Sequence, residues 1–306
     1  MALGLDDVRV GCWTAPAGHT GCTVVLPPPG SLGAIAVRGG APGTREGAAL
    51  SATGNVRECH AVVLSGGSAF GLATADGASA WCEAHGIGYD KTVARIPIVG
   101  AAIVFDLREG GAARPDRDAG WAACEAATNA DPPMGRFGVG AGCTVGKTAG
   151  LEHSQPGGQG WAVARGGGVT VGALLAVNAL GDVLDEQGGI LVGSRAPADR
   201  PRFPYSGPPP GAAVPPEAEH TVIGCLVTDA RLAKHEAVRA ADLSCTGIAR
   251  AVDPAHTTYD GDALFVLCTQ QIEATVDLVA HLGARAVAAA IRAAVRAAAG
   301  ASPWAC

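Results

Sequence analysis

The sequence has few charged residues and no cluster of basic ones. Asp, Glu, Lys and Arg make up 16% of the 306 residues, and the formal net charge is −6. Nucleic acids and anionic membranes attract proteins through concentrated positive charge, so we expect neither as a partner. Glycine is abundant instead, with 45 residues. This composition suits tight turns between closely packed sheets and helices.

The ten cysteines lack the spacing of a metal site or a redox motif. They are scattered along the chain, with no CxxC and no Cys/His cluster. Several lie in apolar runs such as "VIGCLVTDA", where a free thiol behaves as a small hydrophobic side chain. We therefore expect free thiols, no structural zinc and no cofactor. The N-terminal segment "MALGLDDVRVGCW" lacks the basic and then apolar pattern of a signal peptide, so we expect a cytoplasmic protein.

Strands and helices alternate irregularly along the sequence. "GCTVVL" and "LGAIAV", separated by a Pro-Gly turn, predict a β-hairpin. A strand, a glycine turn and a helix are predicted over 60–86, and the alanine-rich residues after 273 predict one or two helices. This order favours sheet packed on sheet with helices outside. Periodicity alone leaves a doubly wound α/β sheet open.

Residues 196–220 form the one low-complexity segment, and it is rich in proline. Its composition favours extended, semi-rigid or disordered backbone. It stops at Thr221, which begins the apolar run "TVIGCLVTDA". One interpretation is a linker that meets a strand. The other is that the chain is cut before Thr221, so that one residue carries both a hydroxyl and a free α-amine. Such an amine, with a pKa of about 7.7–8.0, can accept the proton of the hydroxyl.

Two carboxylates lie close together in "AHTTYDGDALF". Asp260 and Asp262 flank a glycine just before an apolar strand. Positions two apart in extended backbone share a face, so both carboxylates converge on one site. Like charges so close raise the pKa of at least one of them. The alternative is an acidic turn at the start of a strand. No nearby ligand set supports a metal there.

Three further features have both a structural and a chemical interpretation. Asn178 ends an apolar strand, as a turn residue or as an N–H donor to an oxyanion. Lys147 is a lone lysine in "GAGCTVGKTAG", either at the surface or partly desolvated beside a reactive group. "LSGGSAFG" fits neither a Walker motif nor GxGxxG, so it is a strand–helix turn or the wall of a substrate pocket.

The order and spacing of several motifs resemble one known family. These motifs are "VRVGCWT", "GCTVVL", "VRGGAPGTRE", "AVVLSGGSAFGLATADGASAWCEAHGIGY", "IPIVGAAIVFDL", "VGAGCTVGK", "GGVTVGALLAVNALGDV", "HTVIGCLVTDARL" and "ARAVDPAHTTYDGDALFVLCT". Together they resemble the DmpA-type self-processing aminopeptidases, and more closely their nylon-oligomer (6-aminohexanoate oligomer) endo-hydrolase branch. The resemblance covers most of the chain.

The resemblance implies one α/β (α+β) domain over 1–306, a four-layer αββα sandwich. This fold looks like that of N-terminal nucleophile hydrolases and is shared with ornithine acetyltransferase. It also implies self-cleavage between His220 and Thr221 into an α chain, 1–220, and a β chain, 221–306. Homo-oligomers of αβ units, such as tetramers, are typical of the family.

The resemblance also implies the site residues. The nucleophile matches Thr221, the strand-end asparagine Asn178, and the lysine Lys147. The polar pair matches Asp260 and Asp262, and "DGD" looks like the nylon-hydrolase branch. The implied activity is hydrolysis of amide bonds in small peptides or ω-amino acid oligomers. An acyltransferase of the ornithine acetyltransferase type and an unprocessed, non-catalytic homologue are the alternatives.

Two positions depart from the family pattern. The residue before the nucleophile is usually small or Asn, and here it is His220, whose imidazole could slow self-cleavage or assist it as a base. "GTREGAAL" replaces a more acidic continuation after "GTRE". If that segment lines the pocket, the substrate preference differs from that of the family.

Overall fold

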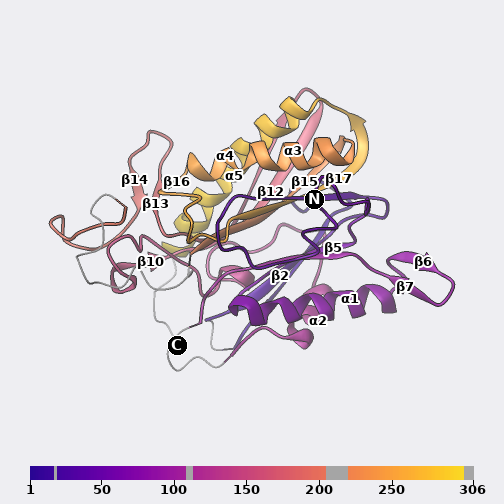
Figure 1. The fold of residues 1–306 in the computed structure, drawn as a ribbon, viewed down its shortest axis with the longest axis horizontal. Helices are drawn as coiled ribbons and strands as arrows, with labels where there is room; N and C mark the ends of the chain where they lie inside the picture. Colours follow the sequence, from indigo (N-terminus) through magenta and orange to yellow (C-terminus); the bar gives the residue numbers. More distant parts are fainter. Residues whose placement is uncertain (17–18, 108–112, 205–219, 300–306) are drawn as a thin grey trace.

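The computed structural model describes residues 1–16, 19–107, 113–204 and 220–299, and in it two five-stranded sheets face each other (Figure 1). The first sheet has the order β1 (Arg9–Thr14), β2 (Gly21–Leu26), β5 (Ala61–Ser65), β8 (Val99–Ile103), β4 (Thr44–Arg45). The second has the order β11 (Gly158–Gly166), β12 (Val169–Asn178), β15 (Thr221–Arg231), β17 (Ala263–Glu273), β3 (Leu32–Val37). Neighbouring strands are antiparallel except for the parallel pairs β5–β8 and β15–β17.

Helices cover the outer face of each sheet (Figure 1). On the first sheet lie α1 (Thr74–Ala84) and α2 (Arg117–Glu125), and on the second lie α3 (Lys234–Ser244), α4 (Thr246–Ala249) and α5 (Val276–Ala299). The smaller elements are β6 (Tyr89–Lys91), β7 (Ala94–Ile96), β9 (Thr144–Val145), β10 (Gln155–Pro156), β13 (Asp182–Leu184), β14 (Ile190–Val192), β16 (Val252–Asp253) and three 3₁₀ turns, η1 (Ser68–Ala73), η2 (Gly138–Gly140) and η3 (Leu151–His153).

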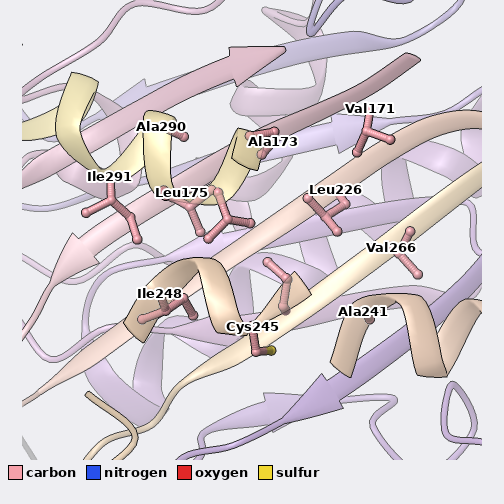
Figure 2. Packing of buried hydrophobic residues seen from close by; sticks show 14 of the residues in the cluster. Val171, Ala173, Leu175, Leu226, Ala241, Cys245, Ile248, Val266, Ala290 and Ile291 are labelled. Atoms are coloured by element: carbon pink, nitrogen blue, oxygen red, sulfur yellow. The ribbon is translucent and has the colours of Figure 1, made fainter. Parts of the chain in front are cut away.

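The alternation of side chains along the central strands explains the layers. In β15, Ile223 and Val227 point between the two sheets, while Val222 and Leu226 point toward the helices. Figure 2 shows the helix-facing layer, where Leu226 and the side chains of β12 and β17 meet those of α4 and α5. Both faces of these strands are buried, as their apolar sequences require. The predicted αββα sandwich is confirmed.

The predicted hairpin between β2 and β3 is wrong. Both strands form where expected, but β2 pairs with β1 and β5 in the first sheet, whereas β3 pairs with β17 in the second. The connection "PPPGS" between them therefore crosses from one sheet to the other. A two-residue hairpin turn would keep both strands in one sheet, and three consecutive prolines do not form one.

Helix α5 is the one helix, among the described residues, that is long and apolar enough to cross a membrane. Within its apolar window, 67% of the residues are buried. Val287, Ile291 and Val295 belong to the core between this helix and the second sheet. Its length and composition are thus those of a core helix that covers a sheet.

Most of the Pro-rich segment, residues 205–219, lies outside the described residues. The part before it is ordered against two loops. The backbone N–H of Phe203 donates to the carbonyl of Thr148 at 2.9 Å, and the ring of Phe203 meets that of Tyr259 edge-on, with centroids 5.8 Å apart. Because Thr148 follows Lys147 and Tyr259 precedes Asp260, this segment runs beside the residues singled out in the sequence.

Candidate active site

Thr221 is the first residue of β15, at the centre of the second sheet. It pairs in antiparallel register with Asn178, the last residue of β12, and is only 4% exposed. Its hydroxyl donates to the carbonyl oxygen of His220 at 2.5 Å. The side-chain oxygen therefore lies against the peptide bond that precedes its own residue. Burial and the sheet register hold it there.

The side chain of Asn178 holds a buried lysine. Its Oδ1 accepts from Lys147 Nζ at 2.9 Å and from the N–H of Thr144 at 2.9 Å, and its backbone carbonyl accepts from the same Nζ at 3.0 Å. Its Nδ2 donates to the carbonyl of Phe105 at 2.9 Å. Lys147 is 5% exposed, which matches the interpretation of a desolvated ammonium group. The carboxamide is thereby fixed in orientation directly beside Thr221.

Asp262 anchors the other side of Thr221. Its Oδ1 accepts from the backbone N–H of Val222 at 2.7 Å, and its Oδ2 lies 2.8 Å from Nδ1 of His256. Burial lowers the pKa of His256, but the ion pair with Asp262 outweighs burial, so the pKa is raised. When protonated, this imidazole neutralises the buried Asp262 carboxylate. His256 was not singled out in the sequence.

Asp260 occupies a different environment from Asp262. Its Oδ2 accepts from the N–H of Thr257 at 2.6 Å, and its backbone forms a parallel bridge with His220. Burial, together with the neighbouring negative charge of Asp262, raises the pKa of Asp260 to about 6. The two carboxylates thus differ in environment: Asp262 lies against the His256 imidazole, and Asp260 has a pKa raised to about 6.

His220 is buried and uncharged. It is 7% exposed, and burial together with the positive charge of Lys147 lowers its pKa to about 3. The charge of Lys147 is therefore close enough to His220 to affect the pKa of its imidazole. Adjacent residues in extended backbone point to opposite faces, so we expect the imidazole to point away from the Thr221 hydroxyl. This placement disfavours His220 as the base that deprotonates that hydroxyl.

The five predicted residues converge from distant parts of the chain. Lys147 contacts Asn178, Asn178 pairs with Thr221, and Asp262 binds the next residue along, while Asp260 bridges to His220. The segment "LSGGSAFG" is connected to Asn178 indirectly, through residues 105 and 106. The N–H of Gly67 donates to Asp106 at 2.7 Å, next to the Phe105 carbonyl that Asn178 binds. His256 lies six residues before Asp262, but no sequence pattern marks it as a functional residue.

In the part of the chain that the structure describes, no group of three or more His, Cys, Asp and Glu side chains is arranged to hold a metal ion. The chemistry available at this site is that of a hydroxyl, an amide, an ammonium group and two carboxylates. Such a set can carry out nucleophilic attack on a carbonyl and stabilise the charge that develops.

The pKa of Asp260 has a consequence for stability. Its folded pKa of about 6 exceeds the ordinary value of about 3.9 expected for the unfolded chain. The folded chain therefore binds the extra proton between these pH values, and this contribution to stability is lost as pH rises from about 4 to 6. We expect Asp260→Asn, which does not ionise, to gain stability relative to its parent across this window.

Urea unfolding at pH 4, 5, 6 and 7 measures this difference. Both proteins carry Thr221→Ala, which would block the self-cleavage that the family resemblance implies, so that intact chains are compared. Asp199→Asn, at an exposed position, is the matched control for the loss of one carboxylate. A difference between Asp260→Asn and its parent that stays constant with pH, or that falls as pH rises, contradicts the raised pKa.

A family model described as peptidase family S58 matches residues 4–302. An uncharacterized aminopeptidase of Mycobacterium tuberculosis is 43% identical over 263 residues, which is 81% of this chain and 73% of that protein. The 6-aminohexanoate-oligomer endohydrolase of a Kocuria species is 30% identical over 280 residues, which is 89% of this chain and 76% of that protein. Sequence identity is thus higher to the mycobacterial protein than to the nylon-oligomer enzyme.

Two solved structures share the fold. A beta-aminopeptidase of a Burkholderia species superposes with a TM-score of 0.69 at 20% identity, covering 96% of this chain and 86% of that one. The L-aminopeptidase D-Ala-esterase/amidase of Ochrobactrum anthropi gives a TM-score of 0.71 at 19% identity, covering 97% and 85%. The latter is described as a variant of the Ntn hydrolase fold. At these identities, the likeness concerns the fold.

Proposed function

The chain belongs to peptidase family S58, and from that premise we propose that it is a self-processing amide hydrolase whose nucleophile is Thr221. The observation that carries this proposal is the position of the Thr221 hydroxyl, 2.5 Å from the carbonyl oxygen of His220 at the start of β15. Self-cleavage at that bond yields fragments 1–220 and 221–306. The second fragment then begins with a threonine that bears a free α-amine.

The processed residue combines the nucleophile and its base. The α-amine of Thr221 has an ordinary pKa near neutral pH, so it accepts the hydroxyl proton during attack and passes it to the leaving amine. The attacked carbonyl carbon becomes tetrahedral, and an ester to Oγ1 forms as the amide bond breaks. Water then hydrolyses the ester and restores the enzyme.

The neighbours of Thr221 supply charge and orientation. Asn178 lies opposite Thr221 in the sheet, and its carboxamide N–H together with a backbone N–H holds the oxyanion. Lys147, buried and bound to Asn178, adds positive charge. Asp262 fixes the backbone beside Thr221 through Val222. Asp260, with its pKa raised to about 6, orients the new α-amine. One of the two aspartates also binds an ammonium group of the substrate.

The substrates we propose are amides of small peptides or ω-amino acid oligomers. The family supports amide hydrolysis. The names of two relatives point to the two substrate types, since one is an aminopeptidase and the other hydrolyses 6-aminohexanoate oligomers. Aminoacyl p-nitroanilides and 6-aminohexanoate oligomers, assayed side by side with the processed protein, distinguish the two.

We expect the purified protein to consist of two fragments, the smaller beginning at Thr221. Intact mass spectrometry and N-terminal sequencing of the smaller fragment measure this directly. A chain that stays uncut after long incubation yet hydrolyses amides would refute the N-terminal nucleophile. A cut at another bond would move the nucleophile to another residue.

A further inference from the structure

The hydrogen-bond ladder between β15 and β17 continues past the start of β15. Within the sheet, Ile223 lies beside Ala263 in parallel register. The same pairing reaches upstream, where His220 bridges to Asp260 and the backbone N–H of Gly261 donates to the carbonyl oxygen of His220 at 2.9 Å. The carbonyl of the bond to be cut is therefore held by a backbone donor of the neighbouring chain segment.

That oxygen is the one on which charge would develop. The Thr221 hydroxyl lies 2.5 Å from it, so the nucleophile and the Gly261 N–H meet at the same carbonyl group. When Oγ1 adds to the carbonyl carbon, the oxygen becomes an oxyanion. A donor that already lies 2.9 Å from the carbonyl oxygen needs little movement to bind the oxyanion, since such donors lie 2.7–3.1 Å from the position that an oxyanion occupies.

The residues on either side of Gly261 form backbone hydrogen bonds with the segment that follows β3. The carbonyl of Asp260 accepts from Ala41 N–H at 2.9 Å, and the carbonyl of Asp262 accepts from the N–H groups of Arg38 and Gly39 at 2.9 and 3.1 Å. A Cβ at Gly39 would lie 2.1 Å from the carbonyl oxygen of Asp260. Glycine at position 39 lets the two backbone segments approach closely. This explains why the motif "VRGGAPG" contains a glycine there.

Position 261 leaves little room for a side chain. A Cβ built there would lie 2.8 Å from Oγ1 of Thr221 and 3.1 Å from the carbonyl oxygen of Ala41. The first distance is shorter than Cβ atoms normally adopt, so a side chain would push the hydroxyl away from its target. The position therefore combines an N–H donor with the space that the nucleophile needs.

We propose that the backbone N–H of Gly261 is the oxyanion donor for self-cleavage of the His220–Thr221 bond. The proposal rests on the self-processing function proposed above. Oγ1 bonds to the carbonyl carbon of His220, and the Gly261 N–H binds the resulting oxyanion. The hydroxyl proton passes to the amide nitrogen of Thr221, the C–N bond breaks, and an ester remains. Water hydrolyses the ester to the carboxylate of His220, the hydroxyl of Thr221 and its amine.

The test removes this one N–H. Nonsense suppression with glycolic acid at position 261 replaces the amide N–H by an ester oxygen and adds no side chain. The full chain is made by translation in vitro, pulse-labelled with leucine and chased, and its fragments are separated on a denaturing gel. We expect self-cleavage to slow by about 10²–10³-fold. Glycolic acid at Gly30, an exposed turn glycine with open space around its Cα, is the matched control and should cut at the normal rate.

The outcomes separate catalysis from structure. Resistance to added protease measures the folded fraction of each chain. If the position-261 ester chain is folded and cuts as fast as the control, the bond is an ordinary ladder hydrogen bond and the proposal is wrong. If the control and the unmodified chain also stay uncut, the proposed self-processing fails instead. Hydrolysis of the introduced ester itself would break the chain after residue 260, which mass spectrometry distinguishes from a cut after 220.

A second variant tests the steric half of the argument. Gly261→Ala retains the N–H but places a Cβ against Oγ1 of Thr221. We expect it to fold and to cut at least tenfold more slowly, because the hydroxyl is displaced. Normal cutting by Gly261→Ala together with slow cutting by the ester chain would leave the donor role intact and remove the requirement for glycine.

Discussion

Thr221→Ala should give one uncut chain of 306 residues that has no amide-hydrolase activity. The substitution removes the hydroxyl oxygen that lies against the carbonyl of His220, which is the proposed nucleophile of both self-cleavage and turnover. The backbone pairing of residue 221 with Asn178 does not depend on that oxygen. A denaturing gel after long incubation and an amide-hydrolysis assay measure the two losses.

Thr221→Ser is the matched control for this variant. It keeps a hydroxyl at the same place and loses only a methyl group, so it should still cut itself and turn over substrate, more slowly than the unmodified protein. Far-UV circular dichroism shows whether Thr221→Ala is folded. A folded Thr221→Ala chain that hydrolyses amides at the normal rate would refute the assignment of the nucleophile.

Asn178→Ala should lower turnover by about 10²–10³-fold, which is the usual effect of losing one oxyanion donor. The change also removes the Oδ1 acceptor of the buried Lys147 ammonium, which keeps only the backbone carbonyl among its contacts with residue 178. Both effects act on the same developing charge. Turnover is measured per cut chain, with the cut fraction determined by mass spectrometry, so that slow processing is not mistaken for slow catalysis.

Asn129→Ala, at an exposed position before η2, is the matched control and should leave turnover unchanged. Thermal unfolding of both variants shows how much of any loss comes from instability. If Asn178→Ala is well folded, fully cut and as active as the unmodified protein, Asn178 plays no part in binding the oxyanion.

The strands and helices could be predicted from the sequence because their patterns are local. The continuous apolar run "VIGCLVTDA" matches β15, whose side chains fill two different cores. The partners of the strands were not predictable in the same way. "LGAIAV" is equally apolar whether it pairs with β2 or with β17, and the choice depends on the packing of both sheets.

In the site too, the chemical character of single residues could be predicted, whereas their arrangement in the folded sheet could not. Thr221, Asn178 and the two aspartates carry chemical signals that a sequence displays, and the resemblance assigned them roles. The antiparallel register that sets Asn178 opposite Thr221 is a property of the assembled sheet. His256 and Gly261 were missed for a related reason. One acts through an ion pair with Asp262, the other through a backbone N–H, and no side-chain pattern marks a backbone donor.

The strand order of the second sheet determines how the two fragments would be held together if the chain is cut before Thr221, as we propose. β15 and β17 then belong to the C-terminal piece, yet they lie between β12 and β3 of the N-terminal piece. The two polypeptides thus contribute alternating parts of one continuous sheet. Separating them would break the hydrogen bonds between β12 and β15 and those between β17 and β3. Folding before the cut is unimolecular, whereas reassembly afterwards requires two molecules to meet. If the proposed cut occurs, the protein first folds as one chain, and any refolding after the cut proceeds at a rate that depends on protein concentration.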